Sequence, residues 1–503
     1  MRWFIIQLCI WMKRFILCLI ALIVIAIIVV KYFDYFHIIE SYINPLQNKK
    51  QIEINPNYKD KIKVDLYVTG LSFPTSMTFI DNNSILVTEK DQGNVRLISN
   101  GILQKDPIYT VNNISNEAEQ GLLGITSSSK YESKKETPTN YLNFSSSYSL
   151  TSGINALNSF HKLMRHDSNH TIYLYFTEKI FHPKANTSIE VQKDLNYTTR
   201  NRVYEYTWNG IGSLSNPRLI MDLPAEPGPY HNGGKLQMDN AGNLYAVIGD
   251  LTAINNTLQN YPKGNNPSIS IPNNSSVIIR LNPAIESYNS LHSLAYPHQS
   301  NNTNINLTEH YYAYGIRNSF GIDIDPLTGK LWNTENGEDS YDEINLVQPG
   351  FNSGWSKIMG PISRNNDTSV SDLVTFNGSH YSDPEFSWRL PVGVTDIEFL
   401  ESSSLDDDLE NNIFVGDINN GNLYYLKIDS NRSAIDINNS IPNNRNAKGL
   451  QDLVVDDKNE RENIIFAKGF EGRITDIETG SDGNLYILTY FDGNIYRITH
   501  IEK

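Results

Sequence analysis

The chain has 503 residues, a formal net charge of −15 and only two cysteines. Nucleic-acid phosphates need clustered lysine and arginine, and an acidic chain without such a stripe is not expected to bind nucleic acid. Both cysteines, Cys9 and Cys18, lie near the amino terminus, so the rest of the chain has no disulfide or thiol chemistry.

The amino terminus has the pattern of a membrane anchor. Residues 15–30 are uncharged and apolar and follow Lys13 and Arg14. At about 1.5 Å per residue this run is slightly short for a ~30 Å hydrocarbon core, and aromatic residues up to position 36 extend it. A cleaved signal peptide is the alternative, but bulky residues stand where a cleavage site needs small ones. We therefore predict a single-pass protein of the cell membrane, with a cytoplasmic segment at 1–14, a transmembrane helix at 15–36 and an extracellular remainder.

Three further segments are assigned from composition and alternation. Residues 37–61 are predicted to be a juxtamembrane linker, polar after Pro45. Residues 62–68 alternate like an edge strand, which in a closed ring of sheets would complete the last sheet. Residues 127–170 are rich in Ser, Asn and Tyr without a sustained period, and are predicted to be a surface insertion.

A repeated unit accounts for most of residues 62–503. Each copy has an alternating strand, a turn with Gly, Asn or Asp, and an apolar-aromatic strand. The turns supply the positive φ that tight hairpins need. Copies lie at 77–90, 171–178 with 201–208, 236–250, 321–335, 395–417 and 475–490. This repetition predicts an all-β fold, a six-bladed β-propeller of four-stranded antiparallel blades around a central channel. An open run of hairpins in two sandwiches is the alternative.

One histidine stands where it can act on a ligand in that channel. His231 precedes the first strand of the third copy and is followed closely by glycines. Near neutral pH an imidazole can accept a proton, although a loop histidine often only bonds a backbone carbonyl. Asp250 closes the same copy, and Arg317 and Asn318 open the next. These four residues are therefore candidates for one site.

At this point the residues resemble a known family. Six short motifs occur in order: 119–124 (EQGLLG), 231–236 (HNGGKL), 248–250 (IGD), 314–318 (YGIRN), 342–346 (DEINL) and 352–355 (NSGW). Together they are similar to the glucose/sorbosone dehydrogenase family, soluble-type quinoproteins on a six-bladed propeller. The likeness covers residues 62–500.

The resemblance implies a cofactor and roles for individual residues. Pyrroloquinoline quinone (PQQ) would lie in the channel mouth, and a sugar would be the substrate. His231 matches the general base, and Asp250 stands at the position that orients it. Arg317 and Asn318 match contacts on the quinone side, where a cation stabilises developing negative charge.

The resemblance also implies calcium. The backbone carbonyls of Gly337 and Glu338 fall where the family binds the Ca²⁺ that touches the cofactor, and Glu343 matches a ligand of a structural Ca²⁺. Oxygen-rich loops suit this ion.

Of four positions that match cofactor contacts, three depart from the family pattern and one keeps it. Asn419 stands where a lysine is expected, and Arg473 keeps the first of two expected arginines while Thr475 stands at the second. Glu119 replaces an amide and adds negative charge. Each lost cation removes a charge-assisted contact of about 1.5–3 kcal/mol.

Two functions are carried forward. The first is a membrane-anchored quinoprotein that oxidises an aldose or related sugar and passes electrons to an acceptor that the sequence does not name. The second is a propeller without cofactor that recognises glycans or proteins at the cell surface, since a fold alone does not fix a function.

Overall fold

The computed structural model describes residues 51–128, 170–182, 196–252, 274–284, 311–365, 368–441 and 449–501. Within these ranges, Ile52–Lys503 belong to one compact unit. The predicted segments 1–14 and 15–36, most of the linker and nearly all of the insertion at 127–170 lie outside the described residues.

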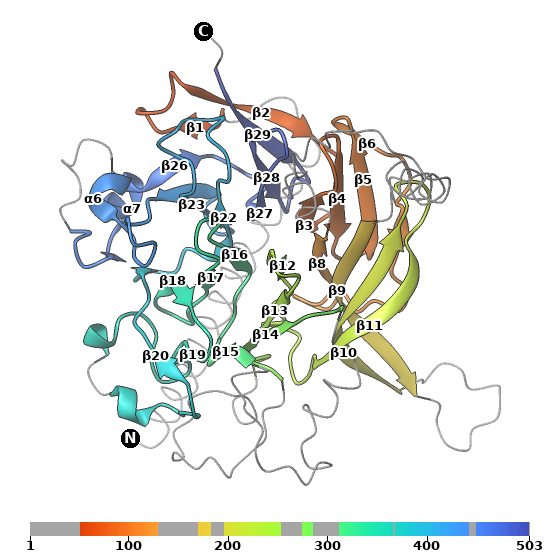
Figure 1. Cartoon of the computed structure of the whole chain (residues 1–503), viewed down its shortest axis with the longest axis horizontal. Helices are drawn as coiled ribbons and strands as arrows, with labels where there is room; N and C mark the ends of the chain where they lie inside the picture. Colours follow the sequence, from red (N-terminus) through yellow and green to blue (C-terminus); the bar gives the residue numbers. More distant parts are fainter. Residues whose placement is uncertain are drawn as a thin grey trace, which may run out of the picture. The chain divides into compact units, whose positions relative to one another are not determined.

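The described strands form six sheets, shown in Figure 1. The innermost strands are β3 (Pro74–Phe79), β8 (Leu122–Ser127), β12 (Leu236–Met238), β16 (Gly321–Ile324), β22 (Val394–Phe399) and β27 (Ile474–Thr479). Each contacts the next in this order, and β27 contacts β3. The fold is therefore all-β and propeller-like, as predicted.

The other strands extend these sheets outward. In chain order they are β1 (Glu53–Ile54), β2 (Ile62–Val68), β4 (Ser84–Glu89), β5 (Asn94–Ser99), β6 (Ile102–Leu103), β7 (Tyr109–Thr110), β9 (His170–His182), β10 (Asn196–Trp208), β11 (Ser215–Pro224), β13 (Leu244–Ile248), β14 (Val277–Leu281), β15 (Tyr311–Tyr314), β17 (Leu331–Glu335), β18 (Asp342–Val347), β19 (Phe351–Asn352), β20 (His380–Tyr381), β21 (Phe386–Trp388), β23 (Ile413–Asp417), β24 (Asn422–Leu426), β25 (Val454–Val455), β26 (Ile465–Lys468), β28 (Leu485–Thr489) and β29 (Ile495–His500). The short helices are α6 (Ile437–Ser440), α7 (Lys458–Asn463), η2 (Ile362–Arg364) and η3 (Val370–Asp372).

The apolar core lies between neighbouring sheets. Strands such as β13 (LYAVI) and β28 (LYILT) are buried at every position. Strands buried on both faces read as continuous apolar runs because each face packs against another layer. One core cluster joins Met77 and Val87 of one sheet to Leu488 of the next, so the repeats stabilise each other across their faces.

The amino-terminal strand completes the last sheet, as the alternation at 62–68 predicted. β2 pairs antiparallel with β29, and the sheet order is β2-β29-β28-β27. Strands from the two ends of the described unit are thereby hydrogen-bonded to each other.

Two expectations about the sheets need correction. The sheets are not uniformly four-stranded and antiparallel, because β19, β20 and β25 add parallel pairs at outer edges. The unit also begins inside the range assigned to the linker, since β1 pairs with β26. Added strands of this kind cover sheet edges whose backbone groups would otherwise stay unpaired.

The predicted membrane location is also corrected. Among the residues that the structure describes, no helix has the length and apolar character needed to cross a membrane. The anchor predicted at 15–36 lies outside those residues. The single-pass location with an extracellular propeller is therefore not carried further.

Buried polar side chains line the inner strands. Asp396 of β22 accepts from Ile477 N at 2.9 Å, and Asp476 of β27 accepts from Met77 N at 2.6 Å, so each carboxylate bonds the next inner strand. Lys235, just before β12, donates to Asp396 at 2.8 Å and to Asp476 at 2.5 Å. We call Lys235, Asp396 and Asp476 the channel cluster. It holds three sheets together.

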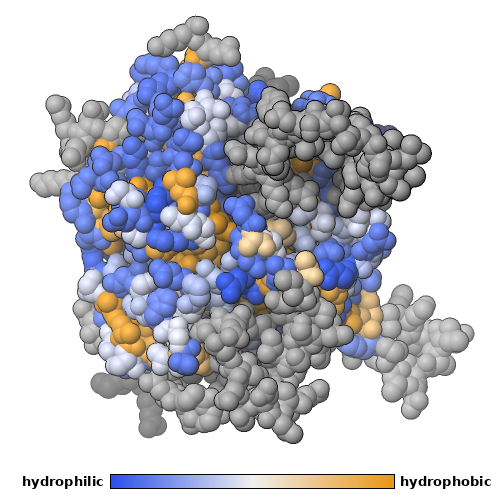
Figure 2. Space-filling model, in the orientation of Figure 1, coloured by the Kyte–Doolittle hydropathy of each residue, from blue (hydrophilic) through white to orange (hydrophobic). Residues whose placement is uncertain are grey.

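Large exposed apolar side chains come from separate elements. Ile102, Ile211 and Leu327 are at least 64% exposed, and they lie in three different sheets or loops. On the face shown in Figure 2, hydrophobic areas are interrupted by hydrophilic ones. Scattered exposure of this kind is ordinary for a folded protein.

Candidate active site

His231 lies in a close hydrogen-bonded pair with Asp250. The ring Nδ1 is 2.6 Å from Asp250 Oδ1, and both side chains are mostly buried. A carboxylate accepts from Nδ1–H, which leaves Nε2 as the ring nitrogen that can accept a proton. The backbone of His231 has φ +59°, and its N–H donates to Glu119 Oε2 at 2.6 Å. The imidazole is therefore fixed both through its ring and through its backbone.

Asp250 is itself held from several directions. Trp355 Nε1 donates to Asp250 Oδ2 at 2.8 Å, and the backbone N–H of Thr252 donates to Oδ1 at 2.8 Å. The preceding residue, Gly249, has no room for a side chain, because a Cβ would lie 2.5 Å from Arg317 O and 2.6 Å from His231 O. This close approach brings the two loops that carry His231 and Arg317 together.

Arg317 lies beside this pair. We call His231, Asp250, Arg317 and Trp355 the His231 corner. Its carbonyl accepts from Asp250 N at 2.8 Å, and its guanidinium carbon is 5.4 Å from the centre of the Trp355 ring. Its Nη1 donates to Asn336 O at 3.0 Å. The Arg317 Nε and the Asn318 Oδ1 are buried and have no hydrogen-bond partner among the described residues. A donor and an acceptor are thus free for a ligand.

Arg473 and Asn419 lie together at a second part of the loops. Arg473 Nη1 donates to Ile418 O at 3.1 Å, next to Asn419 in the chain. Thr475 donates from Oγ1 to Pro74 O at 3.2 Å, so its hydroxyl is hydrogen-bonded to the backbone of the neighbouring sheet. The structure gives no contact between Arg473 or Asn419 and the His231 corner.

Glu119 has a contact that sequence reasoning missed. It is predicted to contact the cofactor, which stays a prediction, and in the structure its carboxylate accepts from the His231 backbone. Burial raises the pKa of Glu119, and the charges of His231 and Arg317 act in the opposite direction. Glu119 therefore belongs to the same corner, where it fixes the backbone that carries the imidazole.

Two buried carboxylates lie on paired strands, and one of them, Glu335, contacts Arg317. Glu335 of β17 is directly opposite Glu343 of β18, and opposite residues share one face of a sheet. We call these two residues the mouth cluster. Glu335 accepts from Arg317 N at 2.7 Å and from Ser353 Oγ at 2.5 Å, and Glu343 accepts from Gly360 N at 2.5 Å.

The pKa values of both carboxylates are raised. Burial raises the pKa of Glu335 to about 7. Burial, and next the charge of Glu335, raise the pKa of Glu343 well above its usual range. The described hydrogen bonds therefore do not compensate for the lost hydration of these two carboxylates.

The predicted metal residues lie in and after this hairpin. Gly337 sits in a turn so tight that a Cβ would lie 2.0 Å from Ser340 O, while Glu338 is exposed. Among the described residues there is no group of three His, Cys, Asp or Glu side chains placed to hold a metal ion. A calcium ion here would thus need backbone or amide oxygens as well.

Two further residues of the site were not assigned roles from the sequence. Trp355 contacts both Asp250 and Arg317, and Glu335 contacts Arg317. Trp355 closes one of the six motifs, and Glu335 ends a strand in the acidic loop. Only these places in the sequence could have pointed to the two residues, and neither place specifies a hydrogen-bond partner.

Comparison with known proteins assigns the class. A model of the family "Glucose / Sorbosone dehydrogenase" matches residues 71–157 and 151–497, which together span most of the chain. The chain belongs to this family, a family of sugar dehydrogenases.

Individual relatives are more distant. An uncharacterized protein of Synechocystis sp. is 22% identical over 481 residues, covering 90% of this chain and 89% of the relative. The aldose sugar dehydrogenase YliI of Escherichia coli is 25% identical over 181 residues, covering 35% of this chain and 40% of the relative. The PQQ-bound aldose sugar dehydrogenase of Streptomyces coelicolor has a similar structure, with a TM-score of 0.53, 18% identity, and coverage of 88% of this chain and 99% of that one. The last likeness supports the propeller-like fold.

Proposed function

We propose that the chain is a PQQ-dependent dehydrogenase that oxidises an aldose or a related sugar. The observation that carries this proposal is the corner in which the His231–Asp250 pair, at 2.6 Å, lies beside Arg317. Residues distant in the sequence meet there in a chain of the matching family. We also propose that the six sheets are the six blades of a complete propeller.

The residues of the corner fit the cofactor. Arg317 Nε and Asn318 Oδ1 are buried polar atoms without a partner among the described residues, and a bound quinone would supply acceptor and donor groups for them. Arg473 would add a cation for a cofactor carboxylate. PQQ, when bound, would supply the acceptor for the hydride that leaves the sugar.

His231 would act as the general base. Its Nε2 would take the proton of the sugar's anomeric hydroxyl, since Nδ1 already bonds Asp250. The imidazole becomes positive in that step, and the carboxylate of Asp250 stabilises this charge. Trp355 and the Thr252 N–H keep the carboxylate in place, so little reorganisation is needed during the reaction.

The mouth cluster fits a calcium ion. Carboxylate and amide oxygens are preferred Ca²⁺ ligands, and Glu335 and Glu343 are buried acids with raised pKa values. Both side-chain atoms of the nearby Asn333 are buried without a partner among the described residues. The Asn333 Oδ1 could complete a set of oxygen ligands. We propose that Glu343 ligates a structural Ca²⁺, and that the carbonyls of Gly337 and Glu338 hold a second one.

The test is dye-coupled sugar oxidation after reconstitution with PQQ and Ca²⁺. His231→Ala should lower kcat by about 10²–10⁴-fold, the usual contribution of general base catalysis, without weakening PQQ binding in calorimetry. His500→Ala is the matched control, because that imidazole bonds only a carbonyl, Leu405 O at 2.9 Å, among the described contacts. Equal activity in His231→Ala and wild type would remove the general base from the proposal.

One observation favours a second function. Asn419 stands in place of a lysine and Thr475 in place of an arginine, and the Thr475 hydroxyl bonds Pro74 O. Two cations expected to bind cofactor carboxylates are therefore missing. A binding propeller without cofactor would need neither. Calorimetric titration with PQQ separates the two functions, since an affinity no tighter than millimolar would favour the binding protein.

A further inference from the structure

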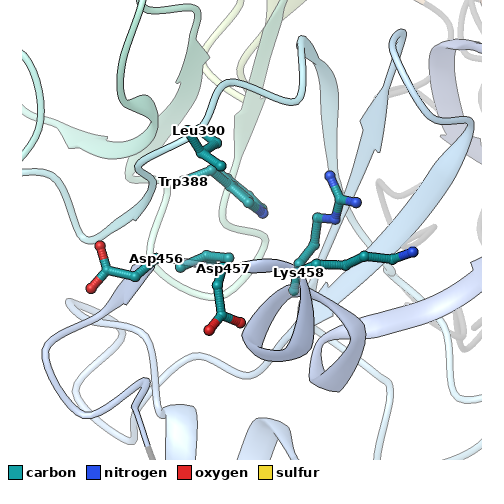
Figure 3. A pocket seen from close by; sticks show the side chains of 7 residues that line it. Trp388, Leu390, Asp456, Asp457 and Lys458 are labelled. Atoms are coloured by element: carbon teal, nitrogen blue, oxygen red, sulfur yellow. The ribbon is translucent and has the colours of Figure 1, made fainter.

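A surface pocket lies apart from the His231 corner. It is formed where β21 and β25 meet the start of α7, and its lining includes Trp388, Leu390, Val455, Lys458 and Arg461. Figure 3 shows the indole nitrogen of Trp388 directed toward the helix that begins at Lys458. None of the residues assigned above to sugar oxidation or to calcium lines this pocket.

Two residues of the lining carry an N–H group in need of an acceptor. The Trp388 Nε1 and the Arg461 Nε are both shielded from solvent, and neither has a hydrogen-bond partner among the described residues. The Trp388 side chain as a whole is fully buried. Both groups can only donate, so they cannot satisfy each other. Buried polar groups are nearly always hydrogen-bonded, and this pair therefore indicates a missing acceptor.

The charges around the pocket favour an anion. Asp456 pairs with Arg364 at 3.0 Å and with Arg389 at 2.7 Å, and Asp457 caps α7 by accepting from Asn459 N and Glu460 N. Their negative charges are thus engaged. Lys458 and Arg461 make no ion pair within the described part of the chain, and Lys458 is exposed at the rim. Lys458 and Arg461 are thus the two lining cations that no carboxylate of the described residues pairs with.

We propose that this pocket binds a small oxyanion, a carboxylate or phosphate group that accepts from Trp388 Nε1–H and Arg461 Nε–H. The oxygen lone pairs satisfy both donors, and Lys458 adds charge at the rim. Exposed Leu390 offers apolar contact to the part of the ligand that carries the anionic group. The inference is independent of sugar oxidation.

The test uses the six tryptophans as reporters. The full chain, labelled with ¹⁵N-tryptophan, is titrated with inorganic phosphate and, separately, with acetate, and Trp388→Phe identifies the Trp388 indole signal. That signal should shift and saturate with one of the two anions. A shift with phosphate would show that the pocket recognises a phosphate group, and a shift with acetate that it recognises a carboxylate. Arg461→Gln should weaken this binding by about tenfold or more. Arg218→Gln is the charge-matched control, because Arg218 pairs with Glu205 in a different sheet, and it should leave binding unchanged.

Two results would overturn the proposal. One is a Trp388 signal that neither anion moves up to about 100 mM, which would mean that the pocket holds only water. The other is equal binding by wild type and Arg461→Gln. If Trp388→Phe does not fold, calorimetry of phosphate and acetate binding to Arg461→Gln and Arg218→Gln decides the same question.

Discussion

Two groups of buried carboxylates in this molecule differ in the groups that compensate their negative charge. In the channel cluster, Asp396 and Asp476 both accept from Lys235. Burial acts to lower the pKa of Lys235, but the two carboxylates outweigh it and the pKa lies well above its usual range. In the mouth cluster, Glu335 and Glu343 accept mainly from backbone N–H, hydroxyl and amide donors.

The difference separates a self-contained site from one that a ligand would complete. A buried charge is tolerated when an opposite charge and hydrogen bonds accompany it. The channel cluster contains its own cation and joins three sheets, although burial raises the pKa of Asp396 well above its usual range and raises that of Asp476 as well. Burial also raises the pKa of both mouth-cluster carboxylates, and among the described residues no lysine or arginine side chain pairs with them, so an added divalent cation would stabilise them. Three predictions test this comparison.

Removal of Lys235 should have the largest effect. Lys235→Met leaves two buried carboxylates without their cation, and breaking a buried pair in this way costs about 3–5 kcal/mol of unfolding free energy. Urea unfolding measures the loss. Lys468→Met removes an exposed lysine paired with Glu462, and it should cost at most about 1 kcal/mol. A loss for Lys235→Met no larger than for this control would show that the channel cluster is not held by its lysine.

Calcium should act on the mouth cluster with a somewhat smaller effect. At a calcium concentration about 100 times its Kd, binding stabilises the folded state by about 2.7 kcal/mol, which a rise in Tm reports. Glu343→Gln should lower this rise, because it removes the structural ion and leaves the ion proposed at the Gly337 and Glu338 carbonyls. Glu338→Gln should keep it, because the Glu338 side chain is exposed and only its backbone carbonyl is proposed to bind. A calcium response that Glu343→Gln leaves at full size would show that Glu343 binds no calcium.

Without calcium, the stability of the chain should fall as the pH rises. The folded pKa of Glu335, about 7, lies above its ordinary value of 4.5, so the folded state holds a proton that the unfolded state has already released. Stability therefore decreases from about pH 4.5 to about pH 7, by roughly 3 kcal/mol, and stays lower above that range.

Substitutions locate the source of this pH dependence. Glu335→Gln should flatten the curve of unfolding free energy against pH. Glu385 titrates in the same window, because burial raises its pKa to about 7 as well, so Glu385→Gln should remove a separate share. An unchanged curve in Glu335→Gln would exclude the mouth cluster as its source.

The sequence was informative where a local pattern fixes the structure. The strand at 62–68 was predicted from its alternation, and its pairing with the last strand follows from closing a ring of sheets. The meeting of His231, Asp250 and Arg317 was expected from short motifs in order, and the hydrogen bonds of Asp250 join the three loops. Alternation along one strand is a local property, which explains why the strand at 62–68 could be predicted from the sequence.

Contacts between distant residues were not accessible in the same way. Lys235 was read only as part of a glycine-containing motif, although its carboxylate partners lie 161 and 241 residues away. Glu119 was placed at the cofactor, while its described contact is to a backbone N–H 112 residues away. Such pairs depend on how sheets pack, and no periodicity in one strand specifies its neighbour in the next sheet.

The pairing of β2 with β29 has a consequence for biosynthesis. Ile62 is among the first residues of the compact unit to be made, and its partner His500 is among the last. The pair cannot form until β29 has left the ribosome, so the sheets made earlier wait until then with one edge unpaired. Emergence of β29, and not the synthesis of any earlier repeat, is then the event that completes the last sheet.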